Sequence, residues 1–346
     1  MGLFSRRKEP DEDGERITGA EMNENRLAML FSAILISVIS IASPGATQEL
    51  FPSRSVKVIV PFAAGSILDT LARVVADGLS KKWSQAVVVE NIAGSAGNSG
   101  SERFARSAPD GYTLLAAPPG PYTMNKLLFK DIGYDASTFT PISLLGTVPV
   151  GLVVRNDFPA KTFEDFIDYV RKNPGKVSYA SQGVGTTPYL IAKLVEARAK
   201  IEMMHVPYRG SSLAQTDLAA GHIDCFFDAI SNALPVMQSG QARILAVTDS
   251  NRVPQLPDVP RVDEFYPGFR AISWFALAAP AGTSPALAER ISRDVADILS
   301  APAVSAKLRE TGLNTVGNTP QETAKFLLEE DQVWSKLVKD IDLKPQ

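Results

Sequence analysis

The alternation of short β-branched runs with helical patterns is the feature that most constrains the fold of this chain. Val56–Val60 is an apolar, β-branched run, and a helical pattern follows it from about Ile67 to Leu79. Strands that alternate with helical stretches of about 10–15 residues are typical of βαβ units and a mostly parallel sheet. The other runs that predict strands are Ala86–Glu90, Tyr112–Ala116, Ile142–Leu145, Val150–Val154, Val177–Ala180, Glu202–Val206, Ile223–Phe227, Ile244–Val247 and Phe275–Ala278.

These runs are more numerous than the roughly six strands of one compact sheet. The chain of 346 residues is long enough for two domains, so the pattern predicts two α/β domains. We expect the chain to leave the first domain near Gly146–Pro149 and to return near Ala271–Trp274. The first lobe is then predicted to combine residues 47–147 with 272–346, and the second lobe to comprise residues 148–271.

The N-terminal segment has the layout of a targeting signal. Leu27–Ala42 is apolar, follows Arg26 directly and precedes the small residues and proline of Ser43–Ala46. It is somewhat shorter than the roughly 20 residues of a spanning helix. Residues 1–42 are therefore predicted to be an N-terminal extension with a secretory signal peptide, which implies export; the alternative is an uncleaved N-terminal anchor.

Composition disfavours several classes of function. The single cysteine, Cys225, excludes an intramolecular disulfide and a cysteine-built metal site, and two histidines leave little material for a zinc centre. The net charge of −3 offers no basic footprint for nucleic acid. We therefore expect no metal, no cofactor and no nucleic-acid partner.

A first candidate binding segment follows the strand that ends at Val60. Ser66 is a plausible N-cap, and Asp69 stands three positions later, like the acidic partner of a capping box. Gly65 would let the backbone approach a ligand, and the free N–H groups of the first helical turn favour a carboxylate or phosphate. The alternative is a well-capped surface helix without a ligand.

A second candidate segment, Tyr179–Tyr189, also passes from a strand through small residues into a helix. Pro188 suits the first helical position, which makes Thr187 the predicted N-cap. The hydroxyl groups come from Ser181, Thr186 and Thr187, and the exposed backbone N–H groups from Gly183 and Gly185. The third glycine of a dinucleotide fingerprint and any Walker sequence are missing, so recognition of a small anion remains open.

Other polar residues have competing interpretations. Ala93–Gly97 approximates an esterase nucleophile turn but has alanine where the motif requires glycine, and only His205 and His222 could supply a base. Asp228 is predicted to emerge at the carboxyl end of a strand, where ligands collect, whereas Asp224 is expected in an exposed turn. The last helix is expected to pack through Trp334 and a face made of Phe326, Leu327, Val333 and Leu337.

In their order along the chain, these segments resemble the Bug family of extracytoplasmic solute receptors, the periplasmic components associated with tripartite tricarboxylate transporters. The resemblance extends over roughly residues 50–340. The matching runs are Val60–Gly65 with Asp69 and Ala72–Arg73, Val89–Asn91 with Gly94 and Gly97, Pro109–Leu114, Tyr179–Gly185, His205–Gly210, Arg252 with Leu256–Pro260, and Ala279–Thr283.

The resemblance implies a type II-like, two-lobed periplasmic binding protein fold. Each lobe would be a mixed, mostly parallel sheet flanked by helices, and crossover strands would form the hinge. Two positions differ from the family pattern: Ser66 replaces a glycine, and Tyr189 replaces a histidine. The residues expected to bind the ligand are Phe62, Ala64, Gly65, Ser66 and Asp69 from one lobe, and Ser181, Gln182, Gly183, Thr186, Thr187 and Asp228 from the other.

The resemblance also implies the function. We expect a monomeric periplasmic receptor, without catalysis, that delivers a small organic carboxylate to the membrane subunits of a tripartite tricarboxylate-type transporter. One alternative is a receptor-like sensor for a carboxylate. A hydrolase on a related two-lobed fold is a further alternative, disfavoured by the poor supply of general bases.

Overall fold

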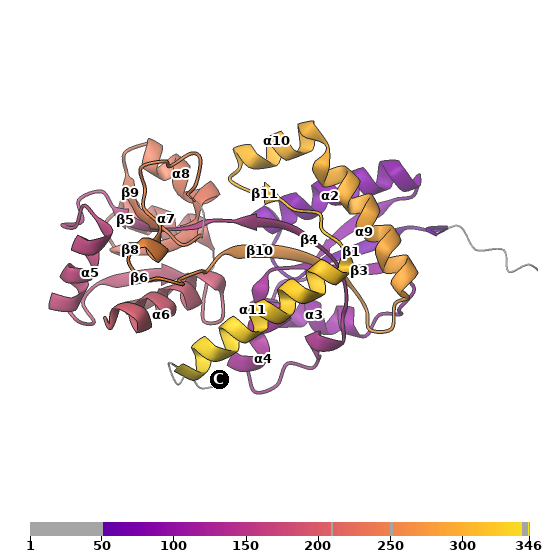
Figure 1. The fold of residues 1–346 in the computed structure, drawn as a ribbon, viewed down its shortest axis with the longest axis horizontal. Helices are drawn as coiled ribbons and strands as arrows, with labels where there is room; N and C mark the ends of the chain where they lie inside the picture. The colour runs from indigo at the N-terminus through magenta and orange to yellow at the C-terminus, as the bar shows by residue number, and fades with distance from the viewer. Residues whose placement is uncertain (1–50, 209, 250–251, 341–344, 346) are drawn as a thin grey trace, which may run out of the picture. The chain divides into compact units, whose positions relative to one another are not determined.

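The strands of the protein form two mixed sheets in the computed structural model, which describes residues 51–208, 210–249, 252–340 and 345 (Figure 1). The first sheet has the order β11-β4-β10-β3-β1-β2 and the second the order β7-β6-β8-β5-β9. The strands of the first sheet are β1 (Val56–Val60), β2 (Val87–Asn91), β3 (Thr113–Ala117), β4 (Thr140–Val148), β10 (Ser273–Ala279) and β11 (Asn314–Thr315). Those of the second are β5 (Val150–Arg155), β6 (Ser178–Ser181), β7 (Met204–Pro207), β8 (Cys225–Ala229) and β9 (Ala242–Val247).

Two mixed sheets flanked by helices confirm the predicted α/β fold class. The expectation that each sheet is mostly parallel was wrong, because β10 in the first sheet and β5 in the second, next to the points where the chain passes between the sheets, pair antiparallel with both of their neighbours. Every predicted strand is present within a few residues of its expected position, and only the two-residue β11, too short to leave a pattern, was missed. The predicted signal segment, residues 1–42, lies outside the described residues. Within the described part of the chain, no helix is long and apolar enough to cross a membrane.

The register of the strands determines where the chain changes sheets. In the first sheet, β1 runs parallel to β2 and β3, and β10 runs antiparallel to β3 and β4. Val148 at the end of β4 pairs with Ser273 at the start of β10. Both therefore lie at the edge where β1, β2 and β3 end, and Pro149 connects that edge directly to β5. The exact limits of the two lobes stay a prediction.

Helices flank both sheets (Figure 1). Their bounds are α2 (Ile67–Trp83), α3 (Asn98–Ala105), α4 (Asn125–Leu128), α5 (Phe163–Lys172), α6 (Thr187–Ala199), α7 (Ser211–Ala219), α8 (Ile230–Gln238), α9 (Pro285–Ser300), α10 (Pro302–Glu310) and α11 (Pro320–Asp340). A π-helical turn, Gly120–Met124, precedes α4. Burial of an apolar stripe supplies most of the stability of such helices. In α2 that stripe contains Leu68, Leu71, Val75 and Leu79.

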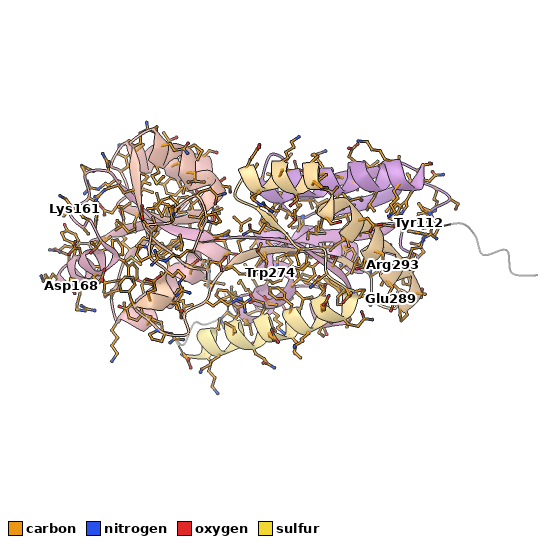
Figure 2. All side chains as sticks on the ribbon, turned by 45° about the horizontal axis from the view of Figure 1, so that its top comes forward. Tyr112, Lys161, Asp168, Trp274, Glu289 and Arg293 are labelled. Atoms are coloured by element: carbon orange, nitrogen blue, oxygen red, sulfur yellow. The ribbon has the colours of Figure 1, made fainter. Side chains whose placement is uncertain are left out.

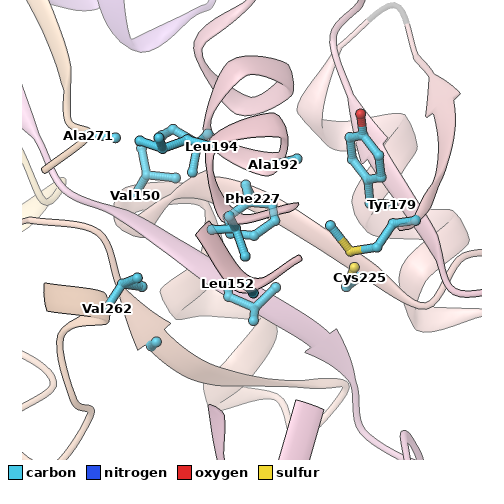
Figure 3. Packing of buried hydrophobic residues seen from close by; sticks show 14 of the residues in the cluster. Val150, Leu152, Tyr179, Ala192, Leu194, Cys225, Phe227, Val262 and Ala271 are labelled. Atoms are coloured by element: carbon cyan, nitrogen blue, oxygen red, sulfur yellow. The ribbon is translucent and has the colours of Figure 1, made fainter. Parts of the chain in front are cut away.

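A large apolar cluster covers one face of the second sheet. Figure 3 shows Leu152 of β5 and Phe227 of β8 packed near Ala192 and Leu194 of α6. Cys225 is also buried there and forms no disulfide. The same cluster includes Met124 and Leu128 from the segment that follows β3, and Trp334 and Val338 from α11. Elements that pack on the first sheet therefore also contribute to the core of the second.

Glu330 of α11 accepts hydrogen bonds from two buried indole groups. Its Oε2 lies 2.8 Å from Trp274 Nε1 and 3.1 Å from Trp334 Nε1, and Glu330 itself is 5% exposed. Figure 2 shows Trp274 in the interior, whereas Lys161 and Asp168 lie at the periphery. The predicted packing of Trp334 is confirmed. The same prediction was wrong for Val333, which is 46% exposed; the side chain of Leu337 is outside the described residues.

We expect Glu330→Leu to destabilise the protein by about 2–5 kcal/mol, because two buried N–H donors lose their acceptor. Glu330→Gln keeps a carbonyl oxygen that can accept, so its effect should be clearly smaller. Chemical denaturation followed by tryptophan fluorescence measures both.

The neighbouring Glu329 provides the control, since it is exposed and pairs only distantly with Lys325, at 4.0 Å. Glu329→Leu should change stability by less than about 1 kcal/mol. Equal losses in the Glu329 and Glu330 variants would show that the indole contacts do not stabilise α11.

Candidate functional site

The segment between β1 and α2 forms an exposed loop held by hydrogen bonds at its base. Ser66 Oγ accepts a hydrogen bond from Asp69 N at 3.1 Å, which confirms Ser66 as the N-cap of α2. The side chain of Asp69 does not form the expected capping box. Its Oδ2 accepts from the backbone N of Gly65 at 2.9 Å, one residue before the cap, and from Arg73 Nε at 3.0 Å. Phe62 is half-buried, and Ala64 is exposed at the tip of the loop.

Asn91, at the end of β2, completes this network and was not predicted as a site residue. Its Nδ2 donates to the carbonyl oxygen of Phe62 at 3.1 Å and to Asp69 Oδ1 at 3.0 Å. Burial opposes ionisation of Asp69, but the hydrogen bonds from Arg73, Gly65 and Asn91 outweigh it and lower the pKa of the carboxyl group. Asp69 and Asn91 together hold both ends of the Phe62–Gly65 loop.

The loops after β2 and β3 pack against the loop after β1. A Cβ atom on Gly97 would lie 2.9 Å from Pro121 and 3.1 Å from the ring of Phe62, so only glycine allows this approach. Asn125 Nδ2 donates to Ala96 O at 3.0 Å and to Asn98 Oδ1 at 2.6 Å. Three loops from the same edge of the first sheet therefore form one surface.

The loop between β6 and α6 is stabilised by the side chains of Ser181 and Thr186. Ser181 is fully buried, and its Oγ accepts from Gly183 N at 3.0 Å. The hydroxyl of Thr186 donates to Gly183 O at 2.7 Å. The predicted N-cap, Thr187, was wrong by one residue: Thr186 keeps the extended conformation of a cap, and α6 already begins at Thr187.

His205 of β7 supports the same loop from inside the second lobe. Its Nε2 lies 2.7 Å from Ser181 Oγ, and its ring packs against Tyr179 and Tyr189 at centroid distances of 5.0 and 4.9 Å. Burial, and to a lesser extent Lys193, lowers the pKa of His205. Tyr189 is 6% exposed, so this departure from the family pattern belongs to the packing around His205.

The contact of Ser181 with His205 lacks the surroundings of a catalytic pair. Ser181 is fully buried, and no carboxylate among the described residues hydrogen-bonds to His205. The described residues also contain no cluster of three His, Cys, Asp or Glu that could hold a metal ion. The contact between Ser181 and His205 stabilises the loop between β6 and α6 and does not form a catalytic nucleophile.

The two acidic residues of the β8 region differ from their predicted surroundings. Asp228 lies at the end of β8 as expected, but it is 2% exposed and accepts hydrogen bonds from Ser211, Gln215, Ala229 and Asn232. Burial raises its pKa against the effect of these donors. Asp224 is not in an exposed turn, because its carboxylate accepts from Arg155 Nε at 3.1 Å and from Ser178 N at 2.9 Å.

The structure brings the second-lobe loop against the surface formed by the first-lobe loops. A Cβ atom on Gly185 would lie 3.2 Å from Leu128 and 3.9 Å from Asn125 Oδ1. Among the described residues, no hydrogen bond joins the Phe62–Asp69 segment directly to the Ser181–Thr187 segment. The residues of this region that were not predicted are Asn91, Asn98, Asn125 and Ser211. Asn91 ends one of the runs that carry the family resemblance, whereas the other three are isolated polar residues and carry no pattern that could have identified them.

A cavity of about 450 Å³ lies elsewhere, beside the crossover segments. Its lining includes Thr147, Pro149, Arg270, Gly312 and Asn314, but none of the predicted ligand-binding residues.

We expect Asp69→Ala to destabilise the protein by about 2–4 kcal/mol, because the donors of Gly65, Arg73 and Asn91 lose their acceptor. Because the folded-state pKa of Asp69 is lowered, its contribution is present at neutral pH and is lost as the pH falls below about 4. Thermal unfolding of the wild-type protein and the variant at several pH values measures how their difference in stability depends on pH. Asp77→Ala is the control, since Asp77 lies on the same helix but is exposed and, among the described residues, pairs only with Lys81.

We expect the melting temperature to fall as the pH decreases through about 6.5, because the unfolded chain binds the His205 proton more readily than the folded chain. His205→Gln should weaken this decrease, whereas His222→Gln should retain it, since the His222 side chain is 70% exposed. An identical pH profile in both variants would contradict the supporting role of His205.

Comparisons with known proteins place the chain in a family. Residues 71–343 match the model of the tripartite tricarboxylate transporter family receptor. The chain is 33% identical to protein BugT of Bordetella pertussis over 326 residues, which cover 93% of this chain and 99% of BugT.

Solved structures show the same fold. Rpa4515 of R. palustris, solved with adipate, is 33% identical and covers 86% of this chain and 100% of its own, with a TM-score of 0.80. MatC of Rhodopseudomonas palustris, with bound malate, is 32% identical and covers 83% of this chain and 100% of its own, with a TM-score of 0.76. The resemblance to the Bug family is thus confirmed, and the chain belongs to the receptors of the tripartite tricarboxylate transporter family.

Proposed function

We propose that this protein is a periplasmic receptor that binds a small dicarboxylate without transforming it. The observation that carries the proposal is that two receptors about one third identical to this chain, and similar along more than four fifths of it, were solved with adipate and malate. Both ligands are dicarboxylates. The proposed ligand-binding residues are those expected from the sequence, from Phe62–Asp69 and Ser181–Thr187, with Asp228 acting from behind the second loop.

The start of α6 is the better anion-binding end of the two candidate helices. The hydroxyl of Thr186 donates to Gly183 O, and no side chain in the described part of the protein caps α6. The first turn of α6 contains no acidic residue. Uncapped N–H groups and the helix dipole favour a carboxylate there. The first turn of α2 instead contains Asp69. Asp69 is paired with Arg73, which limits its repulsion of an anion.

The predicted N-terminal signal supports export, and the family supports delivery of the ligand to the membrane subunits of a tripartite tricarboxylate-type transporter. A monomeric receptor can present its ligand by closing its lobes, as hinged binding proteins do. No cofactor enters this proposal.

A thermal-shift screen of the purified protein against carboxylates tests the proposal, because a ligand that binds only the folded state raises the melting temperature. The panel contains dicarboxylates of four to six carbons, citrate, benzoate and acidic amino acids. We expect at least one dicarboxylate to raise the melting temperature in a concentration-dependent manner and to be recovered unchanged. A protein stabilised by none of them, or one that converts them to product, would contradict the proposal.

The role of the second loop is tested with Gly183→Val. Gly183 has φ 115°, and the space beside its Cα is open, so a valine would both distort the loop and fill the site. We expect at least about a tenfold loss of affinity. The same substitution at Gly240, which also has a positive φ and open space but lies after α8, should leave the affinity unchanged.

A further inference from the structure

The buried carboxylate of Asp228 organises a chain of hydrogen bonds that ends in the proposed site. Its Oδ1 accepts from Ala229 N at 2.8 Å, from Asn232 Nδ2 at 3.1 Å and from Ser211 Oγ at 3.2 Å. Its Oδ2 accepts from Gln215 Nε2 at 2.9 Å. An ionised carboxylate can only accept, and a proton on the group could sit only on Oδ2, since Oδ1 already accepts three bonds. The hydroxyl of Ser211 must therefore donate to Oδ1.

This direction leaves Ser211 Oγ with lone pairs only. The oxygen accepts a short hydrogen bond from Gln182 Nε2, at 2.7 Å, and a longer one from Asn232 Nδ2, at 3.4 Å. If the amide of Gln182 were turned over, its oxygen would face an oxygen without a proton, and the contact would be repulsive. Asp228 thus determines, through Ser211, which end of the Gln182 amide points away from the protein network.

The other end of the Gln182 amide is its carbonyl oxygen, Oε1, which has no hydrogen-bond partner among the described residues. Gln182 is half-buried and belongs to the same loop as Gly183 and the uncapped start of α6. The loop therefore offers backbone donors suited to a carboxylate together with a side-chain acceptor. A carboxylate oxygen placed at Oε1 would be repelled, whereas a hydroxyl or ammonium group would donate to it.

We propose that Asp228 is a positioning residue that sets ligand preference: it holds Gln182 as an acceptor, so that the receptor favours dicarboxylates that carry a hydroxyl or ammonium donor beside one carboxylate. The inference rests on the proposed function and deepens it. It also changes the role expected for Asp228, which acts through Ser211 and does not touch the ligand.

Affinities for matched ligands test this preference. Succinate, malate and aspartate share four carbons and differ in carrying no donor, a hydroxyl or an ammonium group; glutarate, 2-hydroxyglutarate and glutamate form the five-carbon series. Calorimetric titration should show the wild-type protein preferring a donor-bearing member over the plain diacid by about five- to tenfold, the value of one hydrogen bond. Comparing the hydroxyl-bearing ligands with the ammonium-bearing ligands identifies which donor Gln182 Oε1 accepts.

Two variants interrupt the chain of hydrogen bonds from Asp228 to Gln182 in different ways. Ser211→Ala removes the hydroxyl that joins them but leaves Asp228 with three donors, so the fold should be retained. Asp228→Asn supplies a donor to Ser211 and allows the serine hydroxyl to turn toward Gln182. Both should reduce the preference for the donor-bearing ligand about five- to tenfold. Gln215→Met is the matched control, because it removes a donor from the same carboxylate outside the chain to Gln182. It should lower the melting temperature without changing the preference.

A ligand-free measurement separates this inference from the proposed function. The side-chain amide protons of Gln182, followed by NMR, should show one slowly exchanging proton in the wild-type protein and in Gln215→Met. That protection should be lost in Ser211→Ala and Asp228→Asn. Unchanged signals in all variants, or a wild-type preference for the plain diacid, would overturn the inference. If no dicarboxylate binds, the proposed function fails, and the preference built on it fails too; the NMR result then reports only whether Asp228 orients Gln182.

Discussion

The antiparallel pairing of β10 with both β3 and β4 is the constraint on which the site depends. Because Val148 and Ser273 pair at the edge where the parallel strands end, the chain passes between the sheets at that edge. The loops after β1, β2 and β3 lie there as well. In the second sheet, β6 and β8 run parallel, so the loop after Ser181 and the carboxylate of Asp228 share an edge. Ligands of open α/β sheets bind at such carboxyl edges.

Two buried carboxylates, Asp69 after β1 and Asp228 at the end of β8, orient polar groups at these edges of the sheets. Asp69 is held by a guanidinium and two N–H donors, which favours its charged form. Asp228 has four neutral donors and no cation among the residues that bond to it, so burial prevails and raises its pKa. In both cases the carboxylate orients other groups: Asp69 the backbone of Gly65, and Asp228 the amide of Gln182 through Ser211.

Apolar packing also connects the two sheets. Met124, Leu128 and Trp334 join the cluster that covers the second sheet, although they follow β3 or belong to α11. Separating these residues from the rest of the cluster would expose apolar surface, at a cost of about 25 cal/mol for each Å². The cluster therefore resists separation of the two sheets. Gly185 belongs to the same loop as Gly183, and a Cβ atom on it would lie 3.2 Å from Leu128. The loop that is proposed to bind the ligand is therefore adjacent to the packing that holds the sheets together.

The strands, the start of α2 and the family were predictable from the sequence alone. Alternating β-branched runs and helical stripes are local patterns, and Ser66 caps α2 through a bond to a residue three positions away. The partners of the polar side chains, by contrast, depend on the tertiary structure. Asn91 reaches Phe62 and Asp69 from the end of the neighbouring strand β2, and Ser211 of α7 joins Gln182 to Asp228. Such bonds depend on strand order and burial, which a single sequence does not encode as a local pattern. For the same reason Asp228 was correctly placed at a strand end but was expected to face the ligand, whereas neighbouring helices cover it.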